Sequence, residues 1–180
     1  MIRALAATLA FSALALAAQP MPADAHGPSR QKVTKTIEIN APVDKVWKIV
    51  GNFQDLNWHP AVEKTEGTGG NEKGAKRTLT LKGGGQIHEA LVKYDAEAHM
   101  MKYEITDVDV KVLPVNNYSS WLSVEGDGNK SVLSWKGAFY RGYMNNDPPP
   151  ELNDEAAVKA VTGIYEAGLD AAKKAAEAGG

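Results

Sequence analysis

The stretch that decides the fold is residues 37–62, IEINAPVDKVWKIVGNFQDLNWHPAV. Its beginning continues an alternation that predicts a strand with four residues on one side: Val33, Lys35, Ile37 and Ile39. The period then becomes helical, because Pro42 suits the first position of a helix and Gly51 suits its end. Between them, apolar residues follow at i, i+3, i+4 and i+7: Val43, Val46, Trp47 and Val50.

A second apolar cluster follows the helix and ends at Pro60, which predicts a lid packed beside a sheet. In order, this stretch resembles the START-related, helix-grip superfamily in its polyketide cyclase/dehydrase-like branch. The resemblance is carried by Ile37, Ile39, Ala41, Pro42, Val46, Trp47, Phe53, Trp58 and Pro60. It implies an α+β fold in the order β-α-α-β6-α, with a curved antiparallel sheet of about seven strands wrapped around a long C-terminal helix.

The rest of the chain is consistent with that order. Strand-like segments separated by turn-rich breaks are expected near 61–66, 75–82, 86–94, 99–107, 116–126 and 130–140. Their hairpin spacing favours an antiparallel meander. From Glu151 the period is helical again, with one side formed by Leu152, Ala156, Val161, Ile164, Tyr165, Gly168, Leu169 and Ala172.

The first 25 residues are typical of a cleaved signal peptide. Arg3 precedes an uninterrupted run of small and apolar residues, and Ala23-Asp24-Ala25 offers a cleavage site. An uncleaved anchor is the alternative, although the run is shorter than the ~20 residues of a membrane span. We therefore expect export, to the periplasm in a diderm bacterium, of a single domain over 26–180 with a flexible tail over 26–32.

Composition excludes several classes of function. The chain has no cysteine, so neither a disulfide framework nor a thiolate site is available. Twenty basic and 22 acidic residues give a net charge of −2, which disfavours nucleic acid and anionic membranes as partners. No dinucleotide, phosphate-loop or Gly-x-Ser-x-Gly motif is present. We expect no cofactor, no metal and no catalytic set.

One sheet face is predicted to be apolar with two opposite charges. A turn over Gly83–Gly85 would place Leu79 opposite Glu89, and Arg77 diagonally adjacent to that carboxylate. The face would continue on later strands with Met101, Tyr103, Ile105, Leu133, Trp135, Phe139 and Arg141. In the superfamily such a face encloses an apolar pocket. The candidate cavity residues are Trp58, Arg77, Leu79, Glu89, Leu91, Tyr103, Trp135, Phe139 and Arg141. A filled core with a structural Arg77–Glu89 pair is the alternative.

Two histidines invite chemical hypotheses that we rank below structural ones. His59, between Trp58 and Pro60, could titrate near the lid, but a hydrogen bond to a loop carbonyl is the commoner role. His26 would be the mature N-terminus, where its amine and imidazole could chelate copper together with a second histidine. A flexible tail is the simpler interpretation.

Within the superfamily, the chain resembles the small periplasmic accessory proteins encoded with bacterial methanol dehydrogenase. Quoted in order, the matching residues are Lys35–Ile37, Trp58–Val62, Arg77, Leu79, Leu81, Gly84–Gly85, Leu91, Tyr94–Asp95, Tyr103, Ile105, Leu113–Val115, Asn117–Tyr118 and Ser134–Trp135. This resemblance implies a non-enzymatic protein that promotes electron transfer between methanol dehydrogenase and its cytochrome c. The run Pro148–Pro150 and the alanine-rich C-terminal end depart from it.

For that role the expected exposed contact residues are Asn57, His59, Asn116, Asn117 and Tyr118. Two other functions remain open at this point. One is a periplasmic carrier for a small apolar ligand, and the other is a cyclase, dehydratase or hydrolase acting in the same pocket. Fold alone does not choose between them, because function depends on the site that a fold carries.

Overall fold

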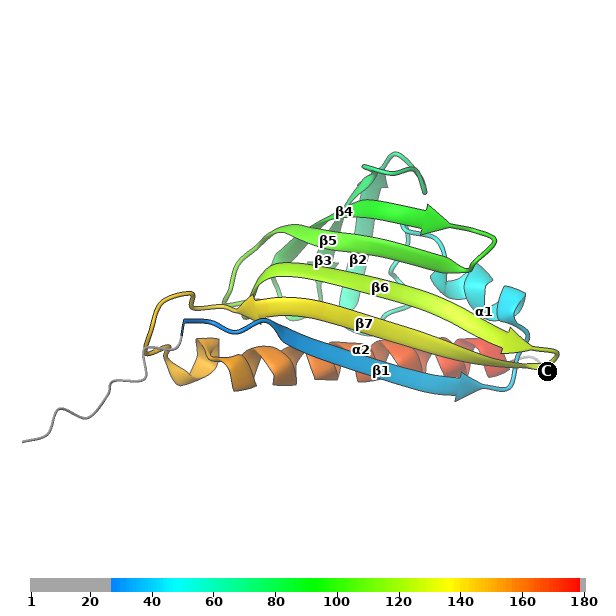
Figure 1. The fold of residues 1–180 in the computed structure, drawn as a ribbon. Helices are drawn as coiled ribbons and strands as arrows, with labels where there is room; N and C mark the ends of the chain where they lie inside the picture. The colour runs from blue at the N-terminus through cyan, green and yellow to red at the C-terminus, as the bar shows by residue number, and fades with distance from the viewer. Residues whose placement is uncertain (1–26, 179–180) are drawn as a thin grey trace, which may run out of the picture.

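The computed structural model describes residues 27–178, so the predicted signal peptide and His26 lie outside the described part of the chain. Seven strands form one antiparallel sheet in the order β1-β7-β6-β5-β4-β3-β2 (Figure 1). Their bounds are β1 Gln31–Ile39, β2 Val62–Thr68, β3 Lys76–Leu81, β4 Gln86–Asp95, β5 Met100–Val108, β6 Val115–Asp127 and β7 Lys130–Arg141. The predicted strands are therefore confirmed, and β1 begins two residues inside the segment expected to be a tail.

Helix α2 (Asp154–Glu177) runs along the concave side of the curved sheet, beside β1 and β7 (Figure 1). A short helix, α1 (Val43–Val50), and a single 3-10 turn, η1 (Pro150–Leu152), complete the fold. This is the α+β architecture that the sequence predicted, with the sheet wrapped around the last helix. Within residues 27–178, no helix is both long and apolar enough to cross a membrane.

Helix α1 is positioned by two residues whose roles differ from the expected ones. Pro42 is the N-cap, in extended conformation, and the helix begins one residue later. Gly51 ends the helix with φ −82°, so a left-handed backbone is not what the position requires. A methyl group there would lie 2.5 Å from the ring of Trp47, so close packing requires the glycine.

The second short helix of the expected β-α-α-β6-α order is absent from residues 51–61, which form consecutive turns. The backbone N–H of His59 bonds to the carbonyl of Leu56 at 2.9 Å, and that of Val62 bonds to the carbonyl of His59 at 3.0 Å. The Asp55 carboxylate accepts from the Asn57 N–H at 2.9 Å. Such side-chain bonds satisfy backbone groups locally and so compete with a helix.

Helix α2 begins at Asp154, three residues later than the sequence pattern suggested. The Asn153 side chain accepts from the Ala156 N–H at 2.8 Å and caps the helix. Its buried face consists of Ala157, Val161, Tyr165, Gly168, Leu169, Ala172 and Ala176. The expected Leu152, Ala156 and Ile164 are only half-buried.

The register of the β3–β4 hairpin differs by two residues from the predicted one. Leu79 lies opposite Ile87, and Arg77 lies directly opposite Glu89. The Leu81 N–H bonds to the Gly85 carbonyl at 3.1 Å, which moves the turn toward Lys82 and lengthens the ladder. Because the shift is an even number, every side chain keeps its face, and the inward set survives.

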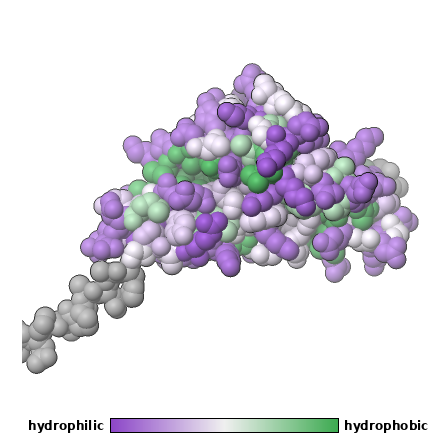
Figure 2. Space-filling model, turned by 45° about the horizontal axis from the view of Figure 1, so that its top comes forward, coloured by the Kyte–Doolittle hydropathy of each residue, from purple (hydrophilic) through white to green (hydrophobic). Residues whose placement is uncertain are grey.

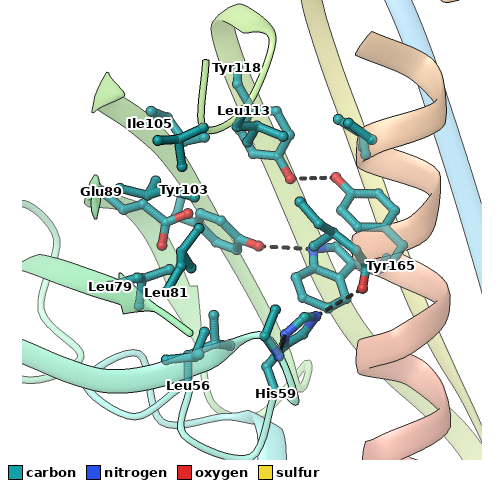
Figure 3. Close-up of a pocket in the computed structure, with 18 residues that line it drawn as sticks. Leu56, His59, Leu79, Leu81, Glu89, Tyr103, Ile105, Leu113, Tyr118 and Tyr165 are labelled. Atoms are coloured by element: carbon teal, nitrogen blue, oxygen red, sulfur yellow. Dashed lines mark hydrogen bonds between the residues drawn. The ribbon is translucent and has the colours of Figure 1, made fainter. Parts of the chain in front are cut away.

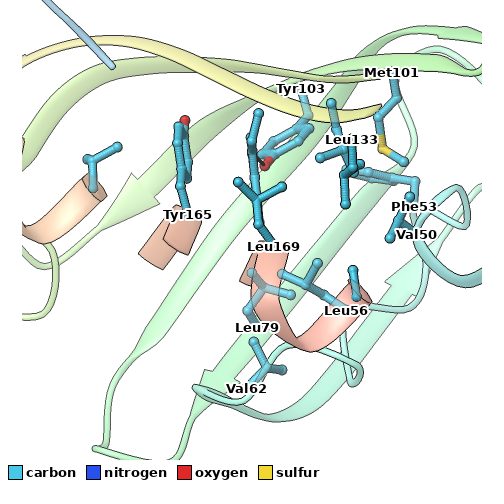
Figure 4. Packing of buried hydrophobic residues seen from close by; sticks show 14 of the residues in the cluster. Val50, Phe53, Leu56, Val62, Leu79, Met101, Tyr103, Leu133, Tyr165 and Leu169 are labelled. Carbon is cyan, nitrogen blue, oxygen red and sulfur yellow. Dashed lines mark hydrogen bonds between the residues drawn. The ribbon is translucent and has the colours of Figure 1, made fainter. Parts of the chain in front are cut away.

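The core lies between this inner face and the two helices (Figure 4). Val50 and Phe53 come from the first helix and the following turns, whereas Leu133 comes from β7 and Leu169 from α2; all four are buried. Toward the N-terminal end of α2 the packing is incomplete, and the resulting gap forms the site described next.

Candidate functional site

A cavity of about 270 Å³ lies between the inner face of the sheet and the N-terminal half of α2 (Figure 3). Its lining is mostly aliphatic and aromatic, with a few polar groups. The residues are Leu56, His59, Ala61, Val62, Leu79, Leu81, Ile87, Glu89, Tyr103, Ile105, Val112, Leu113, Tyr118, Trp135, Ala160, Val161, Ile164 and Tyr165. Pockets of this composition are typical of small-molecule sites.

The structure brings together four of the nine candidate cavity residues: Leu79, Glu89, Tyr103 and Trp135. The other five are placed elsewhere, because an inward direction does not determine which part of a long curved sheet faces the gap. Leu91 and Phe139 are buried in the filled part of the core. Trp58 packs beside Trp135 with ring centroids 6.0 Å apart and lies outside the cavity lining.

Arg141 is also inward but braces the loop before α2. Its guanidinium donates to the carbonyls of Tyr143 at 2.8 Å and Asn145 at 2.9 Å, and to the Asp154 carboxylate at 3.2 Å. Asp154 is the first residue of α2. Arg141 therefore ties β7 to the beginning of the helix that covers the cavity.

Arg77 and Glu89 form a buried ion pair, as the sequence predicted. The Arg77 Nε donates to the Glu89 Oε2 at 2.6 Å, and the two residues are 3% and 5% exposed. Arg77 also donates to the Phe53 carbonyl at 2.9 Å and lies over the Phe53 and Tyr103 rings. Burial raises the pKa of Glu89, and the nearby Arg77 charge only partly opposes this. The arginine lies outside the cavity lining, whereas the glutamate faces the cavity.

A chain of hydrogen-bonded hydroxyl groups joins β6, β7 and α2 along one wall of the cavity. Ser120 donates to the Lys136 carbonyl at 2.9 Å, so its oxygen must accept from Tyr165 at 3.1 Å. Tyr165 in turn must accept from Tyr118, whose hydroxyl lies 2.6 Å away. Desolvation raises the pKa of Tyr165 to about 12 and that of Tyr118 well above its usual value. These hydroxyl groups remain neutral at physiological pH.

Trp135 links this wall to Tyr103. Its indole N–H lies 2.8 Å from the Tyr103 hydroxyl and 2.9 Å from the Ser120 hydroxyl, and it donates to both. The Trp135 ring stacks on Tyr165 at 4.7 Å between centroids. The back of the cavity is therefore a rigid aromatic surface.

His59 is buried at the rim of the cavity, where the prediction of an exposed partner contact is wrong. Its Nδ1 accepts from the Ala61 N–H at 3.1 Å, which places the proton on Nε2, and Nε2 donates to the Ile164 carbonyl at 2.9 Å. Burial lowers the pKa of His59. The side chain thus joins the lid to α2 as a neutral group, and both ring nitrogens are engaged.

The remaining contact candidates divide by exposure. Asn57 and Asn117 are exposed, as expected, and Asn117 adopts a left-handed backbone with φ 48°. Asn116 is half-buried, because its amide donates to the carbonyls of Arg141 and Gly142. Tyr118 is buried in the cavity wall, so its prediction as an exposed contact is also wrong. Tyr118 and Ser120 are two residues apart on β6 and therefore share a face with Leu122 and Val124; this alternation could have indicated that Tyr118 is buried.

Several cavity residues were not identified as site residues from the sequence. Tyr165 was expected on the inner face of the helix, and its 3.6-residue spacing with Val161 already indicated that face. Val112 and Leu113 belong to the β5–β6 loop, where no periodic pattern exists to orient them. Within residues 27–178, no three histidine, aspartate or glutamate side chains are grouped so as to hold a metal ion.

On its outer side, the cavity rim continues into a shallow groove along α2. Figure 2 shows one face of the molecule, on which hydrophilic residues predominate and hydrophobic residues gather in smaller areas. His59, Ala61, Ala160 and Ile164 border both the cavity and the groove. These four residues therefore form the boundary between the cavity and the groove on that side.

Comparisons with known proteins agree with this architecture. Residues 30–177 match the family described as polyketide cyclase / dehydrase and lipid transport. An uncharacterised protein from Bacillus thuringiensis is 31% identical with a TM-score of 0.68, over 81% of this chain and 98% of that one. The protein XoxI from Bacillus cereus is also 31% identical with a TM-score of 0.67, over 80% of this chain and 94% of that one.

A more distant structure shows the fold alone. Norcoclaurine synthase from Thalictrum flavum is 19% identical with a TM-score of 0.62, over 86% of this chain and 98% of that one. A search among curated proteins found no match. The family match spans most of the chain and includes every described strand and the whole of α2 except its C-cap. The chain therefore belongs to the polyketide cyclase/dehydrase and lipid-transport family, within the START-related helix-grip superfamily.

Proposed function

We propose that the protein binds a small, largely apolar molecule in the cavity beneath α2 and does not transform it chemically. The observation that carries this proposal is the cavity itself, an apolar space of about 270 Å³ inside an otherwise well-packed domain. Protein interiors are close-packed, so a space of this size lined by aromatic and aliphatic groups is a feature of ligand sites.

The hydrogen bonds of the polar groups support binding over catalysis. Both ring nitrogens of His59 are engaged in structural bonds, and one oxygen of Glu89 is held by Arg77. A general acid or base must be free to exchange its proton with a substrate. In this cavity the groups best suited to that role also hold the wall together.

The proposal is tested by titrating the purified ¹⁵N-labelled protein with naphthalene and recording amide chemical shifts. We expect shifts confined to amides around the cavity. Leu81→Trp should abolish them, because Leu81 lines the cavity and a larger side chain fills it. Thr80→Trp is the matched control, since its side chain points to the opposite face of β3. The absence of shifts in the wild type would refute the proposal.

The non-enzymatic part has its own test. Any small molecule that copurifies with the protein is identified by mass spectrometry after denaturation and then returned to the folded protein. We expect its mass to be unchanged after prolonged incubation. Conversion to a product would establish an enzyme of the cyclase or dehydratase type instead.

A second candidate function is that of a periplasmic accessory protein of methanol oxidation, which promotes electron transfer from methanol dehydrogenase to its cytochrome c. The specific observation in its favour concerns two segments that carry the sequence resemblance, 58–62 and 113–118. Although distant in the chain, both contribute residues to the same cavity: His59, Ala61, Val62, Leu113 and Tyr118. This candidate includes export, for which the leader-like residues 1–25 are the sequence support.

The accessory role is tested by following cytochrome c reduction by purified methanol dehydrogenase with and without this protein. We expect a faster reduction in its presence. Asn57→Arg should weaken the effect, because Asn57 is an exposed contact candidate, whereas Asn129→Arg places the same charge on the exposed β6–β7 turn and should not. An unchanged rate at every ratio, with no detectable complex, would eliminate this candidate.

A further inference from the structure

Two polar groups on the sheet side of the cavity, Glu89 and Tyr103, provide an acceptor and a donor that no hydrogen bond within residues 27–178 uses. The first belongs to Glu89. Its Oε2 accepts from Arg77, whereas its Oε1 has no hydrogen bond within residues 27–178. The residue is 5% exposed and lines the cavity, and Figure 3 shows its carboxylate beside Tyr103.

The second is the phenolic hydrogen of Tyr103. The Tyr103 oxygen accepts from the Trp135 indole N–H at 2.8 Å, which orients the hydroxyl. Its other polar neighbour is Ser120, whose hydroxyl already donates to the Lys136 carbonyl and accepts from Tyr165 and Trp135, so Ser120 has no capacity left for the Tyr103 hydrogen. Tyr103 is 2% exposed and lines the cavity, so the occupant of the cavity must supply an acceptor for that hydrogen. A donor and an acceptor thus face the same largely apolar space.

The other polar groups around the cavity differ from these two. Tyr118 donates to Tyr165, Tyr165 donates to Ser120 and Ser120 donates to the Lys136 carbonyl, so none of these hydroxyl groups has a free hydrogen. His59 uses both ring nitrogens. Polar groups that face a cavity are paired by its occupant, so Glu89 and Tyr103 determine which polar groups a ligand must carry.

We propose that the cavity selects a neutral, hydroxyl-bearing apolar molecule, an alcohol or a phenol, which accepts from the Tyr103 hydroxyl and donates to Glu89 Oε1. A single hydroxyl group provides both a donor and an acceptor, as this pair of atoms requires. A hydrocarbon leaves both atoms unpaired. A carboxylate brings a second negative charge to Glu89, while Arg77 lies behind that residue and outside the cavity lining. This inference rests on the proposed ligand-binding function.

The experiment compares three probes of one shape, naphthalene, 2-naphthol and 2-naphthoate, by amide chemical-shift titration of the purified protein at neutral pH. We expect 2-naphthol to bind about tenfold or more tightly than naphthalene, as expected for hydrogen bonds to a charged group. We expect 2-naphthoate to bind at least about tenfold more weakly than 2-naphthol. Equal affinities for naphthalene and 2-naphthol would overturn the selectivity but leave apolar binding intact. Binding of none of the probes would overturn both.

A variant then assigns the effect to the Tyr103 hydroxyl. Tyr103→Phe keeps the ring, and the Trp135 N–H retains its bond to Ser120 at 2.9 Å. The preference for 2-naphthol over naphthalene should fall severalfold, with the naphthalene affinity unchanged. Tyr94→Phe is the matched control, because Tyr94 packs on Trp47 outside the cavity lining. A full preference in Tyr103→Phe would overturn the assignment, and the three-probe comparison on the wild type does not depend on how well the variant folds.

Discussion

Substituting Arg77 tests the central physical claim about the inner face, namely that a buried charge there is compensated by one partner. In Arg77→Met the Glu89 carboxylate loses its 2.6 Å bond, and the Phe53 carbonyl loses its donor. Breaking a buried pair from one side costs about 3–5 kcal/mol, because the remaining charge is uncompensated. Since a domain is stable by about 5–15 kcal/mol, we expect a large decrease in the free energy of unfolding.

The measurement is urea denaturation followed by tryptophan fluorescence and circular dichroism. Replacing both partners, as Arg77→Met with Glu89→Leu, should recover at least about half of the loss, because apolar groups of similar volume can replace a buried pair. Lys64→Ala is the control, since it removes an ion pair with Glu66 in which both side chains are more than half exposed, and it should change stability by less than about 1 kcal/mol. A loss below about 1 kcal/mol in Arg77→Met, or a double variant no more stable than the single one, would refute the reasoning.

Three further outcomes are expected. Burial lowers the pKa of His59 below 6.5, so unfolding takes up a proton as the pH falls. The wild type should therefore lose stability relative to His59→Asn between pH 7 and pH 5, and a constant stability difference across that range in denaturant titrations would contradict this. Gly168→Ala should destabilise the protein by about 1–3 kcal/mol, because its methyl group would lie 2.6 Å from the His59 and Trp135 rings. Gly163→Ala on the same helix meets open space and should stabilise the protein by up to about 1 kcal/mol, and calorimetric melting of both variants checks this. Asn153→Ala should cost about 1 kcal/mol through loss of the α2 cap, and a melting temperature equal to that of the wild type would show that the cap contributes nothing.

Much of the fold could be predicted because its signals are local. Alternation identified the strands to within one or two residues, and the 3.6-residue period identified both helices. The prediction of a second short helix was wrong, and the reason is also local. The side chains of Asn52 and Asp55 accept from backbone N–H groups two residues later, and this favours turns over a helix.

The candidate site was harder to predict, because it depends on where the curved sheet and α2 fail to fill the space between them. Leu79 on β3 and Leu91 on β4 both point to the inner face of the sheet, yet only Leu79 lines the cavity. Trp135 and Phe139 lie four residues apart on β7 and point to the same face, and only Trp135 lines the cavity. Alternation reports the face of a strand, whereas the cavity depends on position along the sheet.

The sequence by itself determined the inward and outward faces, the strand order along the chain and the presence of an inner Arg77–Glu89 pair. These follow from periods of 2.0 and 3.6 residues, which act over a few neighbouring positions. Only the tertiary structure decided that His59 is buried, because its partner, the Ile164 carbonyl, lies 105 residues away. The same holds for the hydroxyl groups of Tyr118 and Tyr165, which meet only when α2 packs on the sheet. Contacts between distant segments depend on how whole elements pack, and no local pattern in the chain encodes that distance.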